Sequence, residues 1–242
     1  MRNIKIILEY DGTDFCGWQL QPKERTVQGV LESSLKQLLQ ELPVIHASGR
    51  TDAGVHALAQ VANFKTESEL TVDSIQNGVN SYLPADVRVL CVEEADEAFH
   101  SRYDAVKRTY RYIVGKKAKA VGRHYSWFCN YKLDIRKLRQ ASECLIGEHS
   151  FEAFAKLNQK EKHYLCNVES VRWEESEENL SFIISANRYL HHMVRILLGT
   201  MIDVGRGKLL PGDVQDILAS MDRRRAGSAA PAHGLFLVRV DY

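Results

Sequence analysis

The sequence predicts an α+β protein made of two similar halves with largely antiparallel sheets. Two observations indicate this class. Helical segments alternate with strands that can form hairpins, and the order β-α-β-β-α-β of the first half is echoed by β-α-β-β-α-α-β in the second. We place the halves at residues 1–104 and 105–242, although no linker composition marks the boundary.

Apolar periodicity defines the elements of the first half. Residues 4–10 are predicted to form a strand that ends at Asp11 and Gly12. Between residues 27 and 42, apolar side chains recur every three or four positions, which is typical of one face of a helix. Further strands are predicted at residues 44–45, 60–65 and 87–92, and a second helix at residues 72–82.

The second half begins with an alternating segment, residues 108–114, which predicts a half-exposed strand. A helix is expected at residues 135–145, with Asp134 as its N-cap and Gly147 beyond its end. Residues 168–173 and 180–186 predict a hairpin around an acidic turn, Glu174 to Glu178. Helices at residues 190–204 and 214–221 and a strand at residues 235–240 follow.

Composition narrows the class of protein and its compartment. The 242 residues are 45% hydrophobic and 26% charged, as in an ordinary soluble globular protein. No apolar run is long enough to span a membrane, and the N-terminus lacks the apolar region of a signal peptide. The five cysteines are scattered without a C-x-x-C pair, which argues against a disulfide framework or a zinc site. We therefore expect a cytoplasmic protein with no membrane association.

The loop at residues 49–57 has the most reactive chemistry in the chain. It places Arg50, Asp52 and His56 on a segment with glycines at 49 and 54, directly after an apolar stretch. One interpretation is a turn closed by a local ion pair or an Asx-turn. The other is a presented carboxylate that acts as nucleophile or general base, kept ionised by an arginine such as Arg50 or Arg195.

A basic segment suggests a polyanionic partner, even though the formal net charge is only +1. From Arg102 to Arg123 there are eight basic residues and one acid, Asp104. The segment is either a phosphate-contacting surface or a solvated charged face. Within it, residues 107–112 interleave cations with tyrosines, as in strands that bind RNA, although core tyrosines beside surface arginines give the same pattern.

Six segments, in this order, resemble the TruA family of tRNA pseudouridine synthases, and the resemblance runs nearly end to end. They are residues 8–12 with 17–19, 49–57, 99–103, 108–112, 191–195 and 229–235. The resemblance implies the pseudouridine synthase fold, with its two halves joined across a central catalytic cleft. It further implies a homodimer that needs no cofactor. The implied reaction converts uridine to pseudouridine at positions 38, 39 and/or 40, in the anticodon arm of tRNA.

The resemblance also implies a role for each matched residue. Asp52 would be the catalytic aspartate, which attacks either the uracil ring or C1′ of the ribose, and Arg195 would pair with it. Arg50 would help to displace the base, Tyr110 would stack on the uracil and help to remove the C5 proton, and Leu235 would line the pocket beneath the ring. The remaining substrate-binding residues implied are Phe99, His100, Ser101, Arg102, Tyr103, Lys107 and Arg108.

Several positions depart from the family pattern but leave the catalytic set intact. Ala59, Ala155 and Arg188 replace the usual residues, and Lys162 with His163 stands where an Arg-Thr pair is usual. Residues 158–162 contact RNA in the family, so the choice among the three uridines stays open.

Three other functions remain alternatives at this point. The chain could be a synthase of this fold acting on another RNA, or a tRNA-binding protein with weak catalysis. The third is a hydrolase that uses His56 with His191 or His192, or a metal held by Asp52 and His56. We expect no metal site, because a third ligand at suitable spacing is missing.

Overall fold

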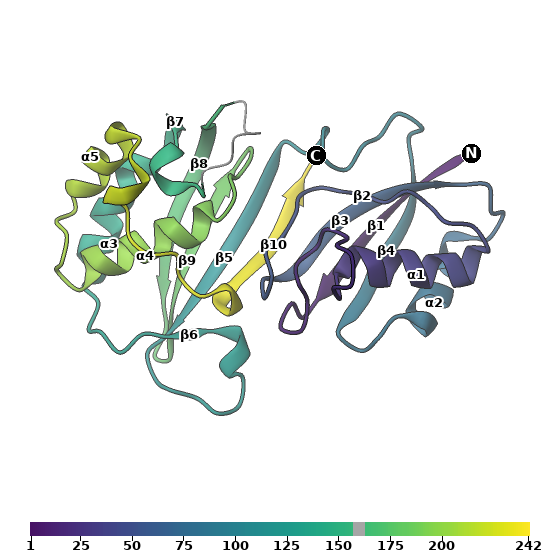
Figure 1. The fold of residues 1–242 in the computed structure, drawn as a ribbon, viewed down its shortest axis with the longest axis horizontal. Helices are drawn as coiled ribbons and strands as arrows, with labels where there is room; N and C mark the ends of the chain where they lie inside the picture. The colour runs from purple at the N-terminus through teal and green to yellow at the C-terminus, as the bar shows by residue number, and fades with distance from the viewer. Residues whose placement is uncertain (157–162) are drawn as a thin grey trace. The chain divides into compact units, whose positions relative to one another are not determined.

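The computed structural model describes residues 1–156 and 163–242, and the chain divides between two units (Figure 1). The first unit comprises residues 1–106 and 236–242, and the second comprises residues 107–235. The sequence predicted one change of unit, after residue 104. In the structure the chain changes unit twice, because the last strand of the chain forms a parallel bridge to a strand of the first unit.

The first unit is built on a sheet in the order β4-β1-β3-β10. Its strands are β1 (Arg2–Tyr10), β3 (His56–Thr66), β4 (Val87–Ala95) and β10 (Leu235–Asp241). Strand β1 runs antiparallel to both β3 and β4, whereas β10 runs parallel to β3 with Phe236 opposite His56. The short strand β2 (His46–Ala47) pairs with β3.

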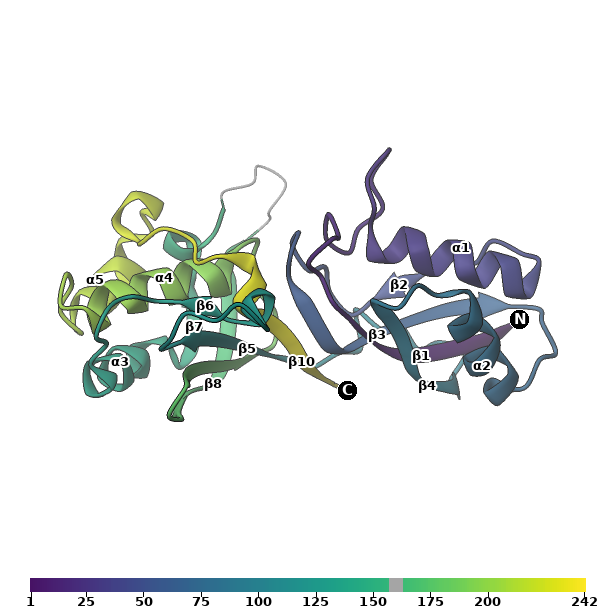
Figure 2. The ribbon, with the colours of Figure 1, turned by 90° about the horizontal axis from the view of Figure 1, so that it is seen from below.

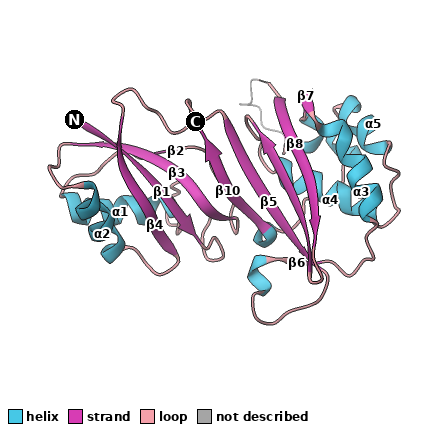
Figure 3. Cartoon of the chain, turned by 180° about the vertical axis from the view of Figure 1, so that it is seen from behind, coloured by secondary structure: helices cyan, strands magenta, loops and turns pink. Residues whose placement is uncertain are grey.

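Two helices cover one face of this sheet and lie beside each other (Figures 2 and 3). Helix α1 (Val27–Leu39) begins at the cap Thr26, whose hydroxyl accepts from the Gly29 amide, and α2 (Val72–Tyr82) begins in the same way at Thr71. The prediction for α2 is confirmed at both ends. Helix α1 ends earlier than predicted, because Gln40 adopts a left-handed conformation with φ 58°.

The strand predicted at residues 44–45 is wrong. Val44 is exposed, and pairing with β3 begins only at His46. A run of two apolar residues has too little periodicity to distinguish a strand from an extended connection. Strand β3 is longer than predicted and starts at His56, so it begins immediately after the loop that contains Asp52.

The second unit is built on an antiparallel sheet in the order β5-β9-β8-β7. Its strands are β5 (Lys107–Gly115), β7 (Gly147–Ser150), β8 (Leu165–Glu175) and β9 (Asn179–Ala186), and β6 (Trp127–Phe128) pairs in parallel with β5. The predicted hairpin around the acidic turn is confirmed as β8 and β9. The short strands β6 and β7 were not predicted.

Helices α3 (Ile135–Ser142), α4 (Met193–Gly205) and α5 (Asp213–Ser220) complete this unit. Asp134 caps α3 as predicted, by accepting from the amides of Arg136 and Lys137. Helix α4 begins later than predicted, because His192 adopts a left-handed conformation with φ 63°. The α+β class with mostly antiparallel pairing is confirmed. Among the helices of residues 1–156 and 163–242, none is long and apolar enough to cross a bilayer.

Candidate active site

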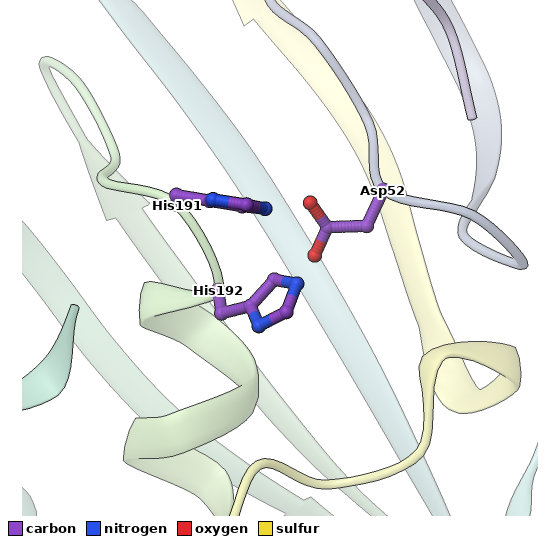
Figure 4. Close-up of side chains that lie close together, drawn as sticks. All are labelled: Asp52, His191 and His192. Atoms are coloured by element: carbon purple, nitrogen blue, oxygen red, sulfur yellow. The ribbon is translucent and has the colours of Figure 1, made fainter. Parts of the chain in front are cut away.

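Asp52 lies in the loop between β2 and β3 (Figure 4), and backbone hydrogen bonds hold that loop on both sides of it. Before Asp52, the carbonyl of Thr51 accepts from the amide of Trp18 at 3.1 Å. After it, the amide of Gly54 donates to the carbonyl of Phe15 at 3.2 Å. The position of the Asp52 backbone is therefore set by the connection between β1 and α1.

Two glycines of that connection permit the close approach. A Cβ on Gly12 would lie 2.0 Å from the carbonyl oxygen of Val55, and a Cβ on Gly17 would lie 2.6 Å from that of Thr51. Gly17 also has φ 87°, which other residues rarely adopt. These contacts explain physically why residues 8–12 and 17–19 accompany the Asp52 loop.

A buried tyrosine on β1 holds the same loop through a hydrogen bond. The hydroxyl of Tyr10 lies 2.7 Å from Oγ1 of Thr51, and either atom can be the donor. Complete burial is the largest influence on the pKa of Tyr10, and this pKa is raised to about 12. Tyr10 therefore stays protonated at physiological pH and keeps this hydrogen bond.

The start of the loop is anchored by β3. The hydroxyl of Ser48 donates to Oε1 of Gln60 at 2.7 Å, and Nε2 of Gln60 donates to the carbonyl of Gly49 at 3.0 Å. Ser48 and Gln60 are buried, whereas Arg50 is exposed and Asp52 is partly exposed. The loop thus combines a fixed backbone with two charged side chains that are not fully buried.

His56 is a structural residue of the first unit. Its ring is 1% exposed and stacks on Phe236 with ring centres 4.7 Å apart. Nδ1 accepts from the amide of Gly12 at 3.0 Å, and a carboxylate oxygen of Asp11 lies 3.1 Å from the same nitrogen. This burial disfavours the hydrolase and metal alternatives that use His56.

The predicted tRNA-contacting segment, residues 99–103, divides into an inner and an outer part. Ser101 is completely buried, and its hydroxyl donates to the carbonyl of His46 at 2.6 Å. The carbonyl of Phe99 accepts from the side-chain amide of Asn3 at 2.8 Å. Arg102 and Tyr103 are exposed, Tyr103 by 76%. Ser101 and Phe99 therefore anchor a segment that presents its other side chains outward.

His100 lies between these two parts and belongs to a cluster of rings. Its ring centre lies 4.6 Å from that of His46 and 4.3 Å from that of Tyr103. Burial, followed by the neighbouring His46, lowers the pKa of His100. The His100 ring is therefore favoured in its neutral form, which can stack on an uncharged partner.

In the second unit, Tyr110 lies on β5 opposite Ile184 and is 8% exposed. Its ring meets the edge of Tyr189 at 4.9 Å and 81°. The hydroxyl of Tyr189 donates to the carbonyl of Ile184 at 2.8 Å, and burial raises the pKa of Tyr189 well above its usual value. Tyr189 was missed by sequence reasoning, because no local pattern connects it with Tyr110 on another strand.

Arg195 projects from the first turn of α4, the helix that begins after His191 and His192 (Figure 4). Its Nε donates to the carbonyl of Ala230 at 2.8 Å, and the amide of Ala230 donates back to the carbonyl of Arg195 at 2.9 Å. This reciprocal pair fixes the plane of the guanidinium, and it joins two segments that the sequence singled out separately.

The segment that leads to Leu235 is seated on α4 and on β5. A Cβ on Gly199 of α4 would lie 1.7 Å from the carbonyl oxygen of Ser228. A Cβ on Gly234 would lie 2.5 Å from the ring of Tyr112, whose hydroxyl donates to the carbonyl of Pro231 at 2.7 Å. Leu235 follows as the first residue of β10 and is 5% exposed.

The basic residues of the second unit have varied partners. Lys107 pairs with Glu169 at 3.0 Å, and Nη1 of Arg108 donates to the carbonyl of Asn187 at 2.8 Å. Lys116 and Lys119 pair with Glu175 and Glu178 of the acidic turn, each at 2.6 Å. The acidic turn therefore offsets part of the basic segment, which is not a uniform positive surface.

Two of the departures from the family pattern contact each other. Nη1 of Arg188 lies 3.2 Å from each ring nitrogen of His163. Ala155 is buried, and the amide of Lys156 donates to the carbonyl of His191 at 2.9 Å. Residues 158–162, which the resemblance associates with RNA contact, lie outside the described residues.

Comparison with known proteins establishes the class, an isomerase of RNA. The model of the family described as tRNA pseudouridine synthase matches residues 6–104 and 141–242. The chain therefore belongs to the tRNA pseudouridine synthase family, as the sequence predicted.

Relatives called tRNA pseudouridine synthase A match over nearly the whole chain. The protein from Caldicellulosiruptor bescii is 41% identical over 244 residues, covering 100% of both chains. The protein from Clostridium botulinum strain Eklund 17B is 40% identical with the same coverage. The protein from Bacillus pumilus is 40% identical over 99% of this chain and 98% of its own.

Proposed function

We propose that this protein converts uridine to pseudouridine at positions 38, 39 and/or 40 of the anticodon arm of tRNA, with Asp52 as its nucleophile. The observation that carries the proposal is the clamp on the Asp52 loop, which fixes the backbone through Thr51 and Gly54. A carboxylate on a preorganised backbone loses little freedom when it meets the reacting atom. The resemblance over six segments and the family membership supply the reaction and the substrate.

The chemistry is an isomerisation whose atoms balance without a co-reactant. The target uridine leaves its stack and enters the site, at a cost of a few kcal/mol. Asp52 attacks the uracil ring or C1′ of the ribose, and the bond between N1 and C1′ breaks. The uracil turns, C5 bonds to C1′, and the bond between Asp52 and the substrate breaks, which restores the free carboxylate. The proton on C5 is lost and N1 gains a proton. No electron is gained or lost overall, so no redox cofactor is required.

The other residues of the site have supporting roles in this proposal. Arg195 pairs with the Asp52 carboxylate, and its hydrogen bond to Ala230 orients the guanidinium for that task. Tyr110 stacks on the uracil and helps to remove the C5 proton, and its edge contact with Tyr189 holds the ring. Leu235 forms an apolar floor. Arg50 is exposed, which suits a side chain that displaces a base.

Contacts with the tRNA extend over both units in this proposal. The exposed outer part of residues 99–103, which comprises Arg102 and Tyr103, meets the tRNA directly, together with the half-buried His100 beside it. Ser101 and Phe99 act by holding that segment in place. Lys107 and Arg108 contact phosphates on the second unit. We further propose that the protein acts in the cytoplasm as a homodimer, and its five free cysteines agree with a reducing compartment.

The test is the mapping of pseudouridine in unmodified tRNA transcripts incubated with the protein. We expect it at one or more of positions 38, 39 and 40, whereas pseudouridine only in another RNA would contradict the substrate. Sedimentation should give twice the 27.5 kDa mass of one chain, and a monomer would contradict the homodimer.

The nucleophile is tested by Asp52→Asn. The variant should keep its tRNA affinity and lose at least about a thousandfold in tritium release from C5-labelled uridine, as expected when a nucleophile is removed. Asp14→Asn, at an exposed carboxylate on the connection between β1 and α1, is the matched control and should keep full activity. Turnover by Asp52→Asn comparable with that of the control would contradict the nucleophilic role.

A further inference from the structure

The second unit contains a pocket of about 250 Å³ beside the connection between β5 and β6. Three cations line it, together with two aromatic rings and a histidine: Lys117, Lys119, Arg123, Trp127, Phe128 and His233. The basic segment singled out in the sequence ends just before Trp127, so cations and aromatics meet again here as they do on β5. None of the roles proposed for the reaction uses these six residues.

The walls of the pocket are fixed by the same framework that holds the predicted site. Trp127 pairs with Val114 of β5 and meets Tyr112 edge-on, with ring centres 6.4 Å apart. Tyr112 in turn packs against Gly234, the residue between His233 and Leu235. The pocket therefore adjoins the segment leading to Leu235.

The three cations around the pocket differ in their partners. Lys119 is paired with Glu178 at 2.6 Å, and this pair lowers the pKa of Glu178. The side chains of Lys117 and Arg123 are exposed, and Nη1 of Arg123 donates to the carbonyl of Ala120 at 3.2 Å. Phe128 is 41% exposed, so one ring can receive a planar partner. Cations beside an accessible aromatic ring match a nucleotide, whose phosphate is anionic and whose base stacks.

We propose that this pocket binds one unpaired nucleotide of the tRNA substrate, distinct from the uridine that is isomerised. Its phosphate contacts Lys117 and Arg123, and its base stacks on Phe128. The identity of the RNA rests on the proposed function, whereas the chemistry of the ligand rests on the pocket itself.

The phosphate contact is tested by the double variant Lys117→Ala/Arg123→Ala. A matched control, Lys132→Ala/Arg139→Ala, removes two exposed charges of the same unit outside the pocket. We expect the pocket variant to bind an unmodified tRNA transcript roughly tenfold more weakly in filter binding. The slope of log K against log salt should fall by about 0.7, since the variant loses one phosphate contact and each single-strand phosphate contact contributes about 0.7. Equal affinity and slope in the two double variants would overturn the proposal.

Stacking is tested at Phe128, where the hydrophobic area can be kept while the ring is removed. Phe128→Leu should weaken tRNA binding roughly tenfold, within the range measured for base stacking, and Phe128→Trp should bind like the wild type. Equal binding by the leucine and tryptophan variants would overturn the stacked base. Circular dichroism melting confirms that each variant is folded.

A third variant predicts a change of the opposite sign. Glu178→Gln removes the acid that holds Lys119, so tRNA binding should become about two- to threefold tighter, with a steeper salt dependence. Weaker binding would count against an anion in the pocket.

Mapping pseudouridine at saturating tRNA separates the two proposals. A wild-type protein that forms no pseudouridine in tRNA would overturn the proposed function, and with it tRNA as the occupant. If the wild type modifies tRNA while the pocket variants bind like their controls, only the pocket assignment fails.

Discussion

The two units hold their predicted catalytic residues by different means. In the first unit, Asp52 has a short side chain on a loop whose backbone is fixed by Trp18 and Phe15. In the second unit, the long side chains of Tyr110 and Arg195 are themselves supported, by Tyr189 and by the carbonyl of Ala230. The carboxylate of a short side chain stays close to its fixed backbone. The terminal group of a long side chain lies farther out, so a small change in a χ angle moves it more and it needs partners of its own.

Gly12→Ala should disrupt the positioning of a catalytic residue most severely. The new Cβ would lie 2.0 Å from the carbonyl of Val55, so the loop must move. We expect a loss of about 3 kcal/mol in the free energy of unfolding, as for severe overpacking. Pseudouridine formation should fall by about a hundredfold, because a displaced nucleophile loses its alignment. Gly49→Ala is the control in the Asp52 loop, since its Cβ meets nothing within 4 Å. Similar urea midpoints for the two variants would contradict the clamp.

In the second unit, the corresponding disruptive substitution is Gly199→Ala. Its Cβ would lie 1.7 Å from the carbonyl of Ser228, so helix α4 and the segment that contains Ala230 must separate. We expect a loss of about 2–3 kcal/mol in urea denaturation and a smaller fall in activity than for Gly12→Ala. Gly212→Ala, whose Cβ meets nothing within 4 Å, should stay within about 0.5 kcal/mol of the wild type. A stable Gly199→Ala would show that the segment can relax.

Arg195→Lys tests the support of a long side chain in the second unit without introducing a steric clash. Lysine keeps the charge but has no Nε donor for the carbonyl of Ala230, so the cation is no longer oriented. We expect kcat to fall roughly 10- to 100-fold, an effect of about 1.4–2.7 kcal/mol, while Kd for tRNA stays within about twofold. Arg139→Lys, on the exposed side of α3, should leave both unchanged. A wild-type kcat for Arg195→Lys would mean that charge alone suffices.

The smallest effect concerns Tyr10 and is visible at alkaline pH. Burial raises the pKa of Tyr10 to about 12, so its stabilising contribution is complete below pH 10 and is lost as the pH rises toward 12. For a pKa raised from 10.0 to about 12, this loss amounts to roughly 2.7 kcal/mol. Tyr10→Phe should cost about 1 kcal/mol at pH 8 for the hydrogen bond to Thr51.

The difference between wild type and Tyr10→Phe should therefore shrink and then reverse between pH 10 and 12, as measured by urea denaturation. Tyr82→Phe, at an exposed position of α2, should give a difference that does not change with pH. A constant difference for Tyr10→Phe would show that Tyr10 ionises as readily in the folded state as in the unfolded chain.

Local patterns predicted much of the fold. Helix α2 was predicted at both ends, and the Asp134 cap and the β8–β9 hairpin were also correct, because periodicity and capping depend on neighbours in sequence. Errors arose where a single residue adopts a left-handed backbone. His192 delays the start of α4, and Gln40 ends α1 early. Histidine is enriched in that conformation but adopts it in only a few per cent of cases, and glutamine is not enriched, so neither residue type identifies it in a sequence.

By itself, the sequence determined the α+β class and the family, since periodic elements and six ordered segments are properties of the linear chain. Only the tertiary structure decided why those segments belong together. Gly12 and Gly17 are needed because backbone from a distant loop lies against them, and the acidic turn offsets lysines of another connection. Close approach and charge pairing join residues that are far apart in sequence, so no local pattern encodes them.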